Sequence, residues 1–265
     1  MDIDTITAIA DPRQAAWRRG DAWLGGGSWL FSTPQPELTR LLDLHAFGWP
    51  PLEAGDDGLE VAATCTLAEL AAWQPPVAWP ASQLFAQCCH ALLGSFKVWN
   101  VATVGGNICL ALPAGPMISL TAALDGVCEI WAPDGSVRPL PVTDLVVGAG
   151  RTALLPGELL RSVRLPAGAL RSRTAFRQVS LSPVGRSAAL LIGRLTPDGS
   201  VALTVTASTD RPVRVDCPPD TAPAVVLARL DAMVEQYLDD VHGGAAWRRA
   251  MTHRLATEIL DELRS

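Results

Sequence analysis

Two glycine-rich segments contain the residues of this 265-residue chain that are best suited to binding chemistry. The first is a Gly-Gly-Gly-Ser stretch at residues 25–28, and the second places Gly-Gly at residues 105–106 between Thr103 and Asn107. Each glycine costs a strand roughly 0.5–1 kcal/mol relative to alanine, so a glycine pair in an apolar run indicates close approach of a ligand to the backbone. Free N–H groups in such a turn form a concave anion site, although either segment alone is also compatible with an ordinary turn.

Together the two segments, 80 residues apart, suit one long ligand with phosphate groups. Backbone amides can hold a diphosphate without any cationic side chain. Lys97 is the exception near the second segment, and a solvated helix end is the favoured interpretation of this residue. Residue 30 is leucine, so the G-x-G-x-x-G fingerprint is not present, and neither is a G-K-[ST] phosphate loop. A Rossmann or P-loop site is therefore disfavoured.

The order and spacing of the two segments resemble the FAD-binding medium subunit of the xanthine dehydrogenase and carbon monoxide dehydrogenase family, the molybdenum hydroxylases. The family's first motif reads roughly A-G-G-T-D-L-L, and G-G-G-S-W-L at residues 25–30 is similar. Its second motif reads R-N-x-A-T-x-G-G-N-I, and W-N-V-A-T-V-G-G-N-I stands at residues 99–108. The likeness extends to L-P-A-G-P at 112–116 and to L-P-G-E-L-L at 155–160, and it covers nearly the whole chain.

The resemblance implies a non-covalent FAD whose pyrophosphate lies between the two segments. The residues implied to bind it are Leu24, Gly25, Gly26, Gly27, Ser28, Trp29, Leu30, Ala102, Thr103, Gly105, Gly106 and Asn107. By the same resemblance, Leu93 and Leu160 lie beside the flavin ring. Arg177 then lies near the pyrimidine end, where it would stabilise negative charge on the reduced flavin, or else it is a strand arginine that faces solvent.

Four positions depart from the family pattern. Trp29 replaces an acidic residue, Trp99 an arginine, Pro116 an aspartate and Leu93 a ring-flanking aromatic residue. These changes leave the phosphate contacts intact and alter contacts near the flavin ring and the ribose. Trp29, Trp99 and Pro116 also motivate an alternative of another class, a scaffold or interaction subunit that has lost its flavin.

The function that the resemblance implies is electron transfer within a heteromeric oxidoreductase. A large partner would hold the molybdenum cofactor and hydroxylate the substrate, and a small partner would hold [2Fe–2S] clusters, with a dimer of heterotrimers as one arrangement. Electrons would pass through this FAD to NAD⁺ or another acceptor, and no catalytic residue is expected in this chain. A stand-alone flavin oxidoreductase is a further alternative. The sequence does not indicate the substrate.

Composition excludes several other classes of protein. The net charge is −6 without a run of like charges, which argues against nucleic-acid binding. The six cysteines form no C-x-x-C pair and the four histidines lie far apart, so no metal site or iron–sulfur cluster is predicted in this chain. Reduced, buried thiols and the lack of a signal peptide or of about 18 consecutive apolar residues predict a cytoplasmic protein without a membrane span.

The predicted fold class is α+β. Residues 1–166 are expected to form an FAD-binding domain of the p-cresol methylhydroxylase (PCMH) type with two α/β subdomains, and residues 167–265 a smaller domain of antiparallel sheet plus helices. Strands are predicted at residues 41–44, 59–64, 159–165, 174–180, 188–195 and 200–208, and a hairpin at 127–140. Helices are predicted after the capping box at 66–69, from Ser82 to about 93, over 117–124, and along an apolar stripe of Met251, Leu255, Ile259 and Leu263.

Overall fold

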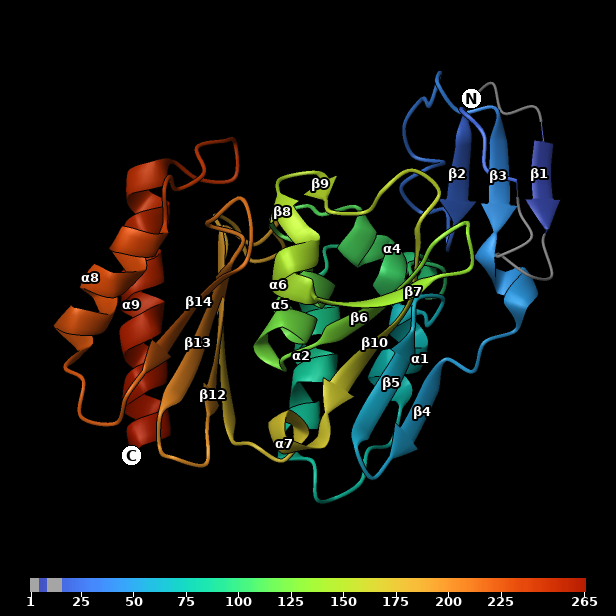
Figure 1. Cartoon of the computed structure of the whole chain (residues 1–265). Coiled ribbons are helices and arrows are strands. Elements are labelled where there is room, and N and C mark those ends of the chain that lie inside the picture. The colour runs from blue at the N-terminus through green and yellow to red at the C-terminus, as the bar shows by residue number, and fades with distance from the viewer. Residues whose placement is uncertain (1–4, 9–15) are drawn as a thin grey trace.

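The computed structural model describes residues 5–8 and 16–265, and its helices and strands confirm the α+β class. Three sheets follow one another across the molecule, with the N-terminal sheet at one end and the C-terminal helices at the other (Figure 1). Among the described residues, no helix combines the length and apolar character that crossing a membrane requires.

The first sheet is parallel and has the order β1-β3-β2. Its strands are β1 (Thr5–Ala8), β2 (Asp21–Leu24) and β3 (Arg40–Asp43), so the strand predicted at 41–44 is confirmed. The carboxylate of Asp21 is fully buried and accepts a hydrogen bond from Arg40 Nε at 2.8 Å. This ion pair ties the start of β2 to β3. The first glycine segment begins where β2 ends.

The second sheet is antiparallel and has the order β4-β5-β10-β6-β7. Its strands are β4 (Leu52–Gly55), β5 (Gly58–Ala62), β6 (Val127–Trp131), β7 (Val137–Pro141) and β10 (Leu159–Pro166). The strands predicted at 59–64 and 159–165 and the hairpin at 127–140 are confirmed. A separate two-stranded ribbon consists of β8 (Val146–Gly148) and β9 (Arg151–Thr152).

Short helices connect and cover these strands. They are η2 (Leu44–Phe47), α1 (Leu67–Ala72), η3 (Pro80–Ser82), α2 (Gln83–Ala91), α3 (Phe96–Trp99), α4 (Val104–Cys109), α6 (Val142–Leu145) and α7 (Ala167–Leu170). The capping box is confirmed, because Thr66 Oγ1 accepts from Glu69 N at 3.2 Å and Glu69 Oε2 accepts from Thr66 N at 2.8 Å. Ser82 does not cap α2. Its hydroxyl donates to the Trp79 carbonyl instead, at 2.6 Å, because a 3₁₀ turn precedes the helix.

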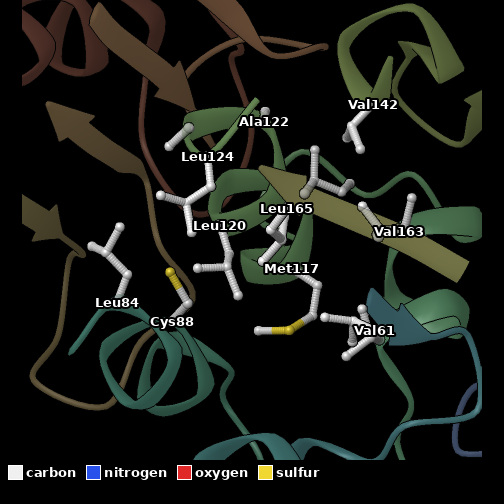
Figure 2. Packing of buried hydrophobic residues seen from close by; sticks show 14 of the residues in the cluster. Val61, Leu84, Cys88, Met117, Leu120, Ala122, Leu124, Val142, Val163 and Leu165 are labelled. Atoms are coloured by element: carbon white, nitrogen blue, oxygen red, sulfur yellow. The ribbon is translucent and has the colours of Figure 1, made fainter. Parts of the chain in front are cut away.

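Helix α5 (Pro116–Ala123) lies in the centre of the molecule, and all eight of its residues are buried. Proline occupies its first position, where a missing N–H costs little. Figure 2 shows Met117 and Leu120 of α5 packed among side chains of β5, β10 and α2. A helix that is apolar on every side must be covered on every side, and α5 therefore joins the elements around it.

The C-terminal sheet is antiparallel, in the order β11-β12-β13-β14, and two helices cover one face (Figure 1). The elements are β11 (Thr174–Val179), β12 (Ala189–Leu195), β13 (Val201–Thr206), β14 (Val213–Cys217), α8 (Pro223–Met233) and α9 (Ala245–Arg264). Three of the strands and the α9 stripe were predicted. Strand β14 was not, because mainly helices were expected after residue 208. Its burial alternates in the manner of a half-buried strand.

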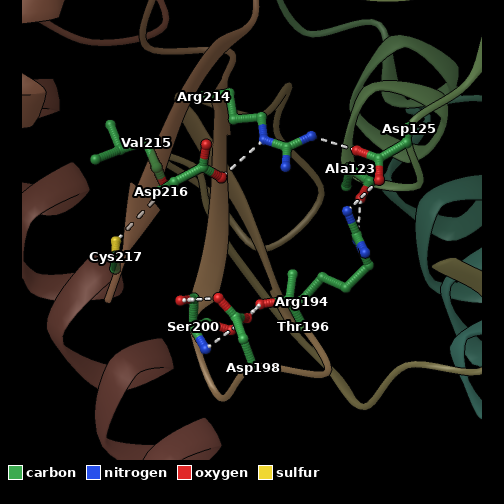
Figure 3. Close-up of polar contacts among 10 residues, drawn as sticks. All are labelled: Ala123, Asp125, Arg194, Thr196, Asp198, Ser200, Arg214, Val215, Asp216 and Cys217. Carbon is green, nitrogen blue, oxygen red and sulfur yellow. Dashed lines mark hydrogen bonds and ion pairs between the residues drawn. The ribbon is translucent and has the colours of Figure 1, made fainter. Parts of the chain in front are cut away.

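Polar contacts join α5 to the C-terminal sheet. Asp125, just after α5, accepts from the guanidinium groups of Arg194 and Arg214 (Figure 3). Arg194 Nε also donates to the Ala123 carbonyl at 3.1 Å. Helix α7 packs against β5 and β10, so residues 167–170 lie with elements of the preceding part of the chain. The division at residues 166 and 167 stays a prediction.

Candidate functional site

The two glycine segments lie side by side. A Cβ atom added to Gly26 would stand 1.4 Å from the Val101 carbonyl oxygen, and one added to Gly25 would stand 2.8 Å from Thr103 Oγ1. Glycine at these positions therefore permits an approach that no side chain would allow. Where the segments meet they line a pocket of about 430 Å³.

The pocket wall is largely apolar. The predicted residues that line it are Gly25, Gly26, Gly27, Ser28, Trp29, Leu30, Leu93, Ala102, Thr103, Gly106 and Asn107. The lining residues that were not predicted are Trp23, Ala91, Leu92, Val98, Cys109, Leu110, Leu112, Ala114, Gly115 and Arg186. Trp23 and Leu92 are neighbours of predicted residues in the chain, and Ala91 and Cys109 lie on α2 and α4. The fold alone brings the other six to the pocket.

The first segment offers unused hydrogen-bond donors. It folds as a tight turn in which Phe31 N donates to the Gly27 carbonyl at 2.9 Å, and Gly27 has a φ of +69°. Among the residues that the structure describes, the backbone amides of residues 25–30 donate to no protein acceptor. Several adjacent amides without partners, in a turn that lines a pocket, form the kind of concavity that binds anions.

The secondary structure of the second segment differs from the prediction. Its glycines belong to helix α4 rather than to a β-rich run, and Thr103 is the N-cap. Thr103 Oγ1 accepts from Gly106 N at 3.1 Å, and Gly105 N donates to the Ala63 carbonyl at 2.9 Å. The expectation of free amides in both segments is therefore wrong for residues 104–107, whose N–H groups all have partners.

Gly105 is required for packing. An added Cβ would stand 2.4 Å from the Cβ of Ala63, and Gly105 does not line the pocket. The side chain of Asn107 also has a structural partner, because Asn107 Oδ1 accepts from Met117 N at 3.0 Å. Helix α5 has no side-chain cap at its own N-terminus, so Asn107 supplies that acceptor from α4.

Three other predicted residues lie outside the pocket. Leu24 is buried at the end of β2, and its Cδ1 would lie 3.2 Å from a Cβ atom added to Gly27, so Leu24 packs against the turn. Leu160 is buried in the main hydrophobic core on β10. Arg177 is on β11 and donates to Glu262 Oε2 at 2.6 Å and to Glu258 Oε2 at 3.2 Å, both on α9. In this arrangement Leu160 packs and Arg177 is ion-paired, and neither reaches the pocket.

The titratable groups of the pocket do not suit acid–base or nucleophilic chemistry. No Asp, Glu or His is found among the described residues that line it. Burial raises the pKa of the Cys109 thiol to about 12, so this thiol is protonated at neutral pH and a poor nucleophile. In the described part of the chain, no group of three His, Cys, Asp or Glu side chains is placed to hold a metal ion.

Unpaired amides, glycines that leave room at the backbone and apolar walls fit a cofactor with both a diphosphate and an apolar ring. The fold and the pocket thus define a class of cofactor-binding α+β protein. Residues 28–168, more than half of the chain, match the family described as "FAD binding domain in molybdopterin dehydrogenase". The chain belongs to this family, and the resemblance seen in its two motifs is confirmed.

Relatives and solved structures agree with this assignment. The chain is 30% identical to a xanthine dehydrogenase of Oryza sativa over 49% of its own length and 10% of that protein. It is 30% identical to the putative xanthine dehydrogenase FAD-binding subunit XdhB of Escherichia coli over 60% of its length and 57% of that protein. A structure of reconstituted CO dehydrogenase from Oligotropha carboxidovorans shares the fold, with a TM-score of 0.83, 20% identity, and coverage of 97% of this chain and 95% of that chain. The PCMH-type fold is thereby confirmed.

Proposed function

We propose that this chain is the FAD-binding, electron-transferring subunit of an oxidoreductase of the xanthine dehydrogenase and CO dehydrogenase type. The observation that carries the proposal is the row of unpartnered amides at residues 25–30, which lines one pocket together with Thr103 at the start of α4. These amides would donate to the diphosphate of FAD. Gly106 leaves space at the opposite wall, where its added Cβ would meet only Thr103 Oγ1, at 2.9 Å.

The protein would supply position and environment. When bound, the flavin supplies the ability to take up electrons singly or in pairs. Leu92 and Leu93 offer apolar surface for part of the cofactor, and Trp29, which is 42% exposed, replaces the acidic residue of the family motif at the pocket wall. Because the lining lacks an acid or base, the bound cofactor and not a side chain would be the redox-active group.

The wider assembly is part of the same proposal. A large subunit with a molybdenum cofactor would hydroxylate the substrate, and a small subunit with [2Fe–2S] clusters would deliver electrons to this chain. Electrons would leave to NAD⁺ or another soluble acceptor. We place the assembly in the cytoplasm, where the six cysteines, all free among the described residues, remain reduced.

A flavin-less scaffold receives little support from the substituted positions. Trp99 does not line the pocket and packs edge-on against His90, at 4.9 Å between ring centroids. Pro116 is buried at the first position of α5 and is also outside the pocket. Of the three substitutions that motivate the scaffold, only Trp29 therefore lies where it can touch a ligand.

The test is the flavin content of the gently purified full chain, alone and after co-purification with its partners. The expected result is a yellow protein with one non-covalent FAD per chain. Replacing Gly106 with valine fills the pocket, and the only atom near the new Cβ is Thr103 Oγ1, so Gly106→Val should fold but retain no flavin. A wild-type chain without flavin, or a Gly106→Val chain with full activity and assembly, contradicts the proposal and favours the scaffold.

A further inference from the structure

Arg186 is the one charged residue among the described residues that line the pocket. It comes from the loop between β11 and β12, which belongs to the C-terminal sheet and not to the part of the chain with the glycine segments. Within the described residues Arg186 forms no ion pair or side-chain hydrogen bond. Arg177, on the strand that leads into this loop, is instead paired with Glu258 and Glu262. A free guanidinium at the edge of a pocket without carboxylates attracts an anion.

The backbone around Arg186 is held in place. Ala188 N donates to the Val179 carbonyl at 2.8 Å, and Gln178 Nε2 donates to Ser187 Oγ at 2.8 Å, which closes the base of the loop. The buried guanidinium of Arg248 donates to the Ala188 carbonyl at 2.8 Å. Arg186 therefore lies next to Ser187 and two residues before Ala188, both of which are hydrogen-bonded within the C-terminal part of the chain.

The C-terminal sheet is also fixed against the floor of the pocket. Ala207 N, just after β13, donates to the Pro113 carbonyl at 2.9 Å, and Arg248 Nη1 donates to the Ala207 carbonyl at 2.7 Å. Pro113 stands between the pocket residues Leu112 and Ala114. The wall that carries the glycines and the loop that carries Arg186 are thus parts of one hydrogen-bonded arrangement.

We propose that Arg186 binds the diphosphate of the FAD whose other side is held by the amides of residues 25–30. This proposal rests on the proposed function and adds a specific positioning residue from the C-terminal sheet. Amides alone stabilise an anion through partial charges, whereas a guanidinium donates paired hydrogen bonds and a full positive charge. Lys97, a cation close to the second segment in the chain, lies on α3 and does not line the pocket, whereas Arg186 does.

The experiment compares the affinity of the flavin-free full chain for FAD and for riboflavin, which lacks the diphosphate. Loss of one charge-assisted contact should weaken FAD binding by roughly 10- to 100-fold in Arg186→Gln. Riboflavin affinity should be unchanged. Arg186→Lys keeps the charge and should recover part of the loss, and the salt dependence of FAD binding should be shallower in Arg186→Gln than in the wild type.

The matched control is Arg171→Gln, which removes an exposed arginine after α7, outside the pocket. It should bind FAD as the wild type does. Equal FAD affinity of the wild type and Arg186→Gln overturns the inference and leaves the proposed function standing. An equal loss for FAD and riboflavin also overturns it, because the residue then shapes the pocket rather than binding phosphate. A wild-type chain that binds no FAD removes the proposed function itself.

Discussion

The two glycine segments border the same pocket, yet their glycines meet different physical demands. In residues 25–30 the amides have no partner among the described residues, and Gly26 lies against the backbone of the other segment. In residues 104–107 every amide has a partner, and Gly105 lies against Ala63 beneath it. The first segment leaves its donors without a protein partner, and the second allows a helix to sit close to β5.

This difference shows that a short glycine motif does not have a single meaning. Glycine permits close approach, but the approaching group can be a ligand or another part of the protein. The two kinds of glycine should therefore respond differently to substitution: one set should change cofactor affinity, and the other should change the free energy of unfolding.

The largest expected effect is that of Gly26→Ala on FAD affinity. Its Cβ would stand 1.4 Å from the Val101 carbonyl oxygen, so the two segments must separate. We expect FAD binding to weaken by roughly 100-fold, as judged from the usual cost of overpacking. Gly26 is half-exposed and outside the hydrophobic core, so separation of the segments should lower the unfolding temperature of the flavin-free chain less than Gly105→Ala does. Titration of the flavin-free chain with FAD, with thermal unfolding as the control, measures both. Unchanged affinity would show that the segments need not touch to hold the cofactor.

Gly105→Ala should show the reverse pattern. The new methyl group meets the Cβ of Ala63 at 2.4 Å and its Cα at 2.7 Å, and neither atom can move away as the end of a flexible side chain would. Overpacking of this kind costs about 1–3 kcal/mol in the free energy of unfolding. Denaturant unfolding measures that loss, with Gly106→Ala as the control because its methyl group meets only Thr103 Oγ1. The folded fraction of Gly105→Ala should still bind FAD. A stable Gly105→Ala chain that fails to bind FAD would place both glycines in the same functional class.

Local patterns in the sequence predict much of the fold. The capping box at Thr66 and Glu69 forms with both of its hydrogen bonds, and Leu255, Ile259 and Leu263 of the α9 stripe are buried. These features depend on residues three or four positions apart, so a single segment contains all the information needed. The convergence of the two glycine segments was also predicted, from their shared pattern and from the resemblance to a family.

Features that depend on distant partners were not predictable in this way. The sequence of residues 103–107 does not reveal that Ala63 and Cys65 accept its amide protons, and so the helix α4 was interpreted as a turn with free amides. Arg186 carries no local signal, since a lone arginine after Gly185 is ordinary loop sequence. Its place at the pocket follows from how the C-terminal sheet packs on α5. Strand β14 was missed although its residues alternate, because a run of only five residues gives a weak local signal.

The side chain of Asn107 caps α5 and also lines the pocket, and two substitutions can separate these roles. In Asn107→Ala, Met117 N loses its acceptor and α5 loses its only side-chain cap, which should cost about 1 kcal/mol, within the usual range for caps. Asn107→Asp keeps the acceptor and should retain the stability of the wild type. The new carboxylate also places a negative charge at the pocket wall, so this variant should bind FAD more weakly, and the loss should be larger at low salt than at high salt. Unfolding and FAD titration of both variants test this. Normal FAD binding by Asn107→Asp would mean that the diphosphate lies away from α4.

The smallest expected effect is the release of FAD at acidic pH, and this effect also distinguishes the two segments. Residues 103–107 contain no ionisable side chain, whereas the strand before residues 25–30 begins with Asp21. Burial alone would raise the pKa of Asp21. Hydrogen bonds from the Arg40 guanidinium and the Arg18 amide outweigh it and hold the pKa below its ordinary value of 3.8.

A lowered pKa means that the ion pair stabilises the folded chain fully above the ordinary aspartate value and that this stabilisation is lost as the pH falls below it. The pairing of β2 with β3, which supports the first segment, should therefore weaken below about pH 4, and FAD should be released in this pH range. Flavin fluorescence followed from neutral pH downward measures the release. In Asp21→Asn the pair with Arg40 is already missing, so FAD should bind more weakly at neutral pH and the acid step should be smaller. The second segment is held by hydrogen bonds from its backbone amides to the carbonyls of Ala63 and Cys65, and it has no side chain that can respond to acid in this way. An identical acid profile in wild type and Asp21→Asn would mean that the release starts elsewhere, and the difference between the segments would then lie in their amides alone.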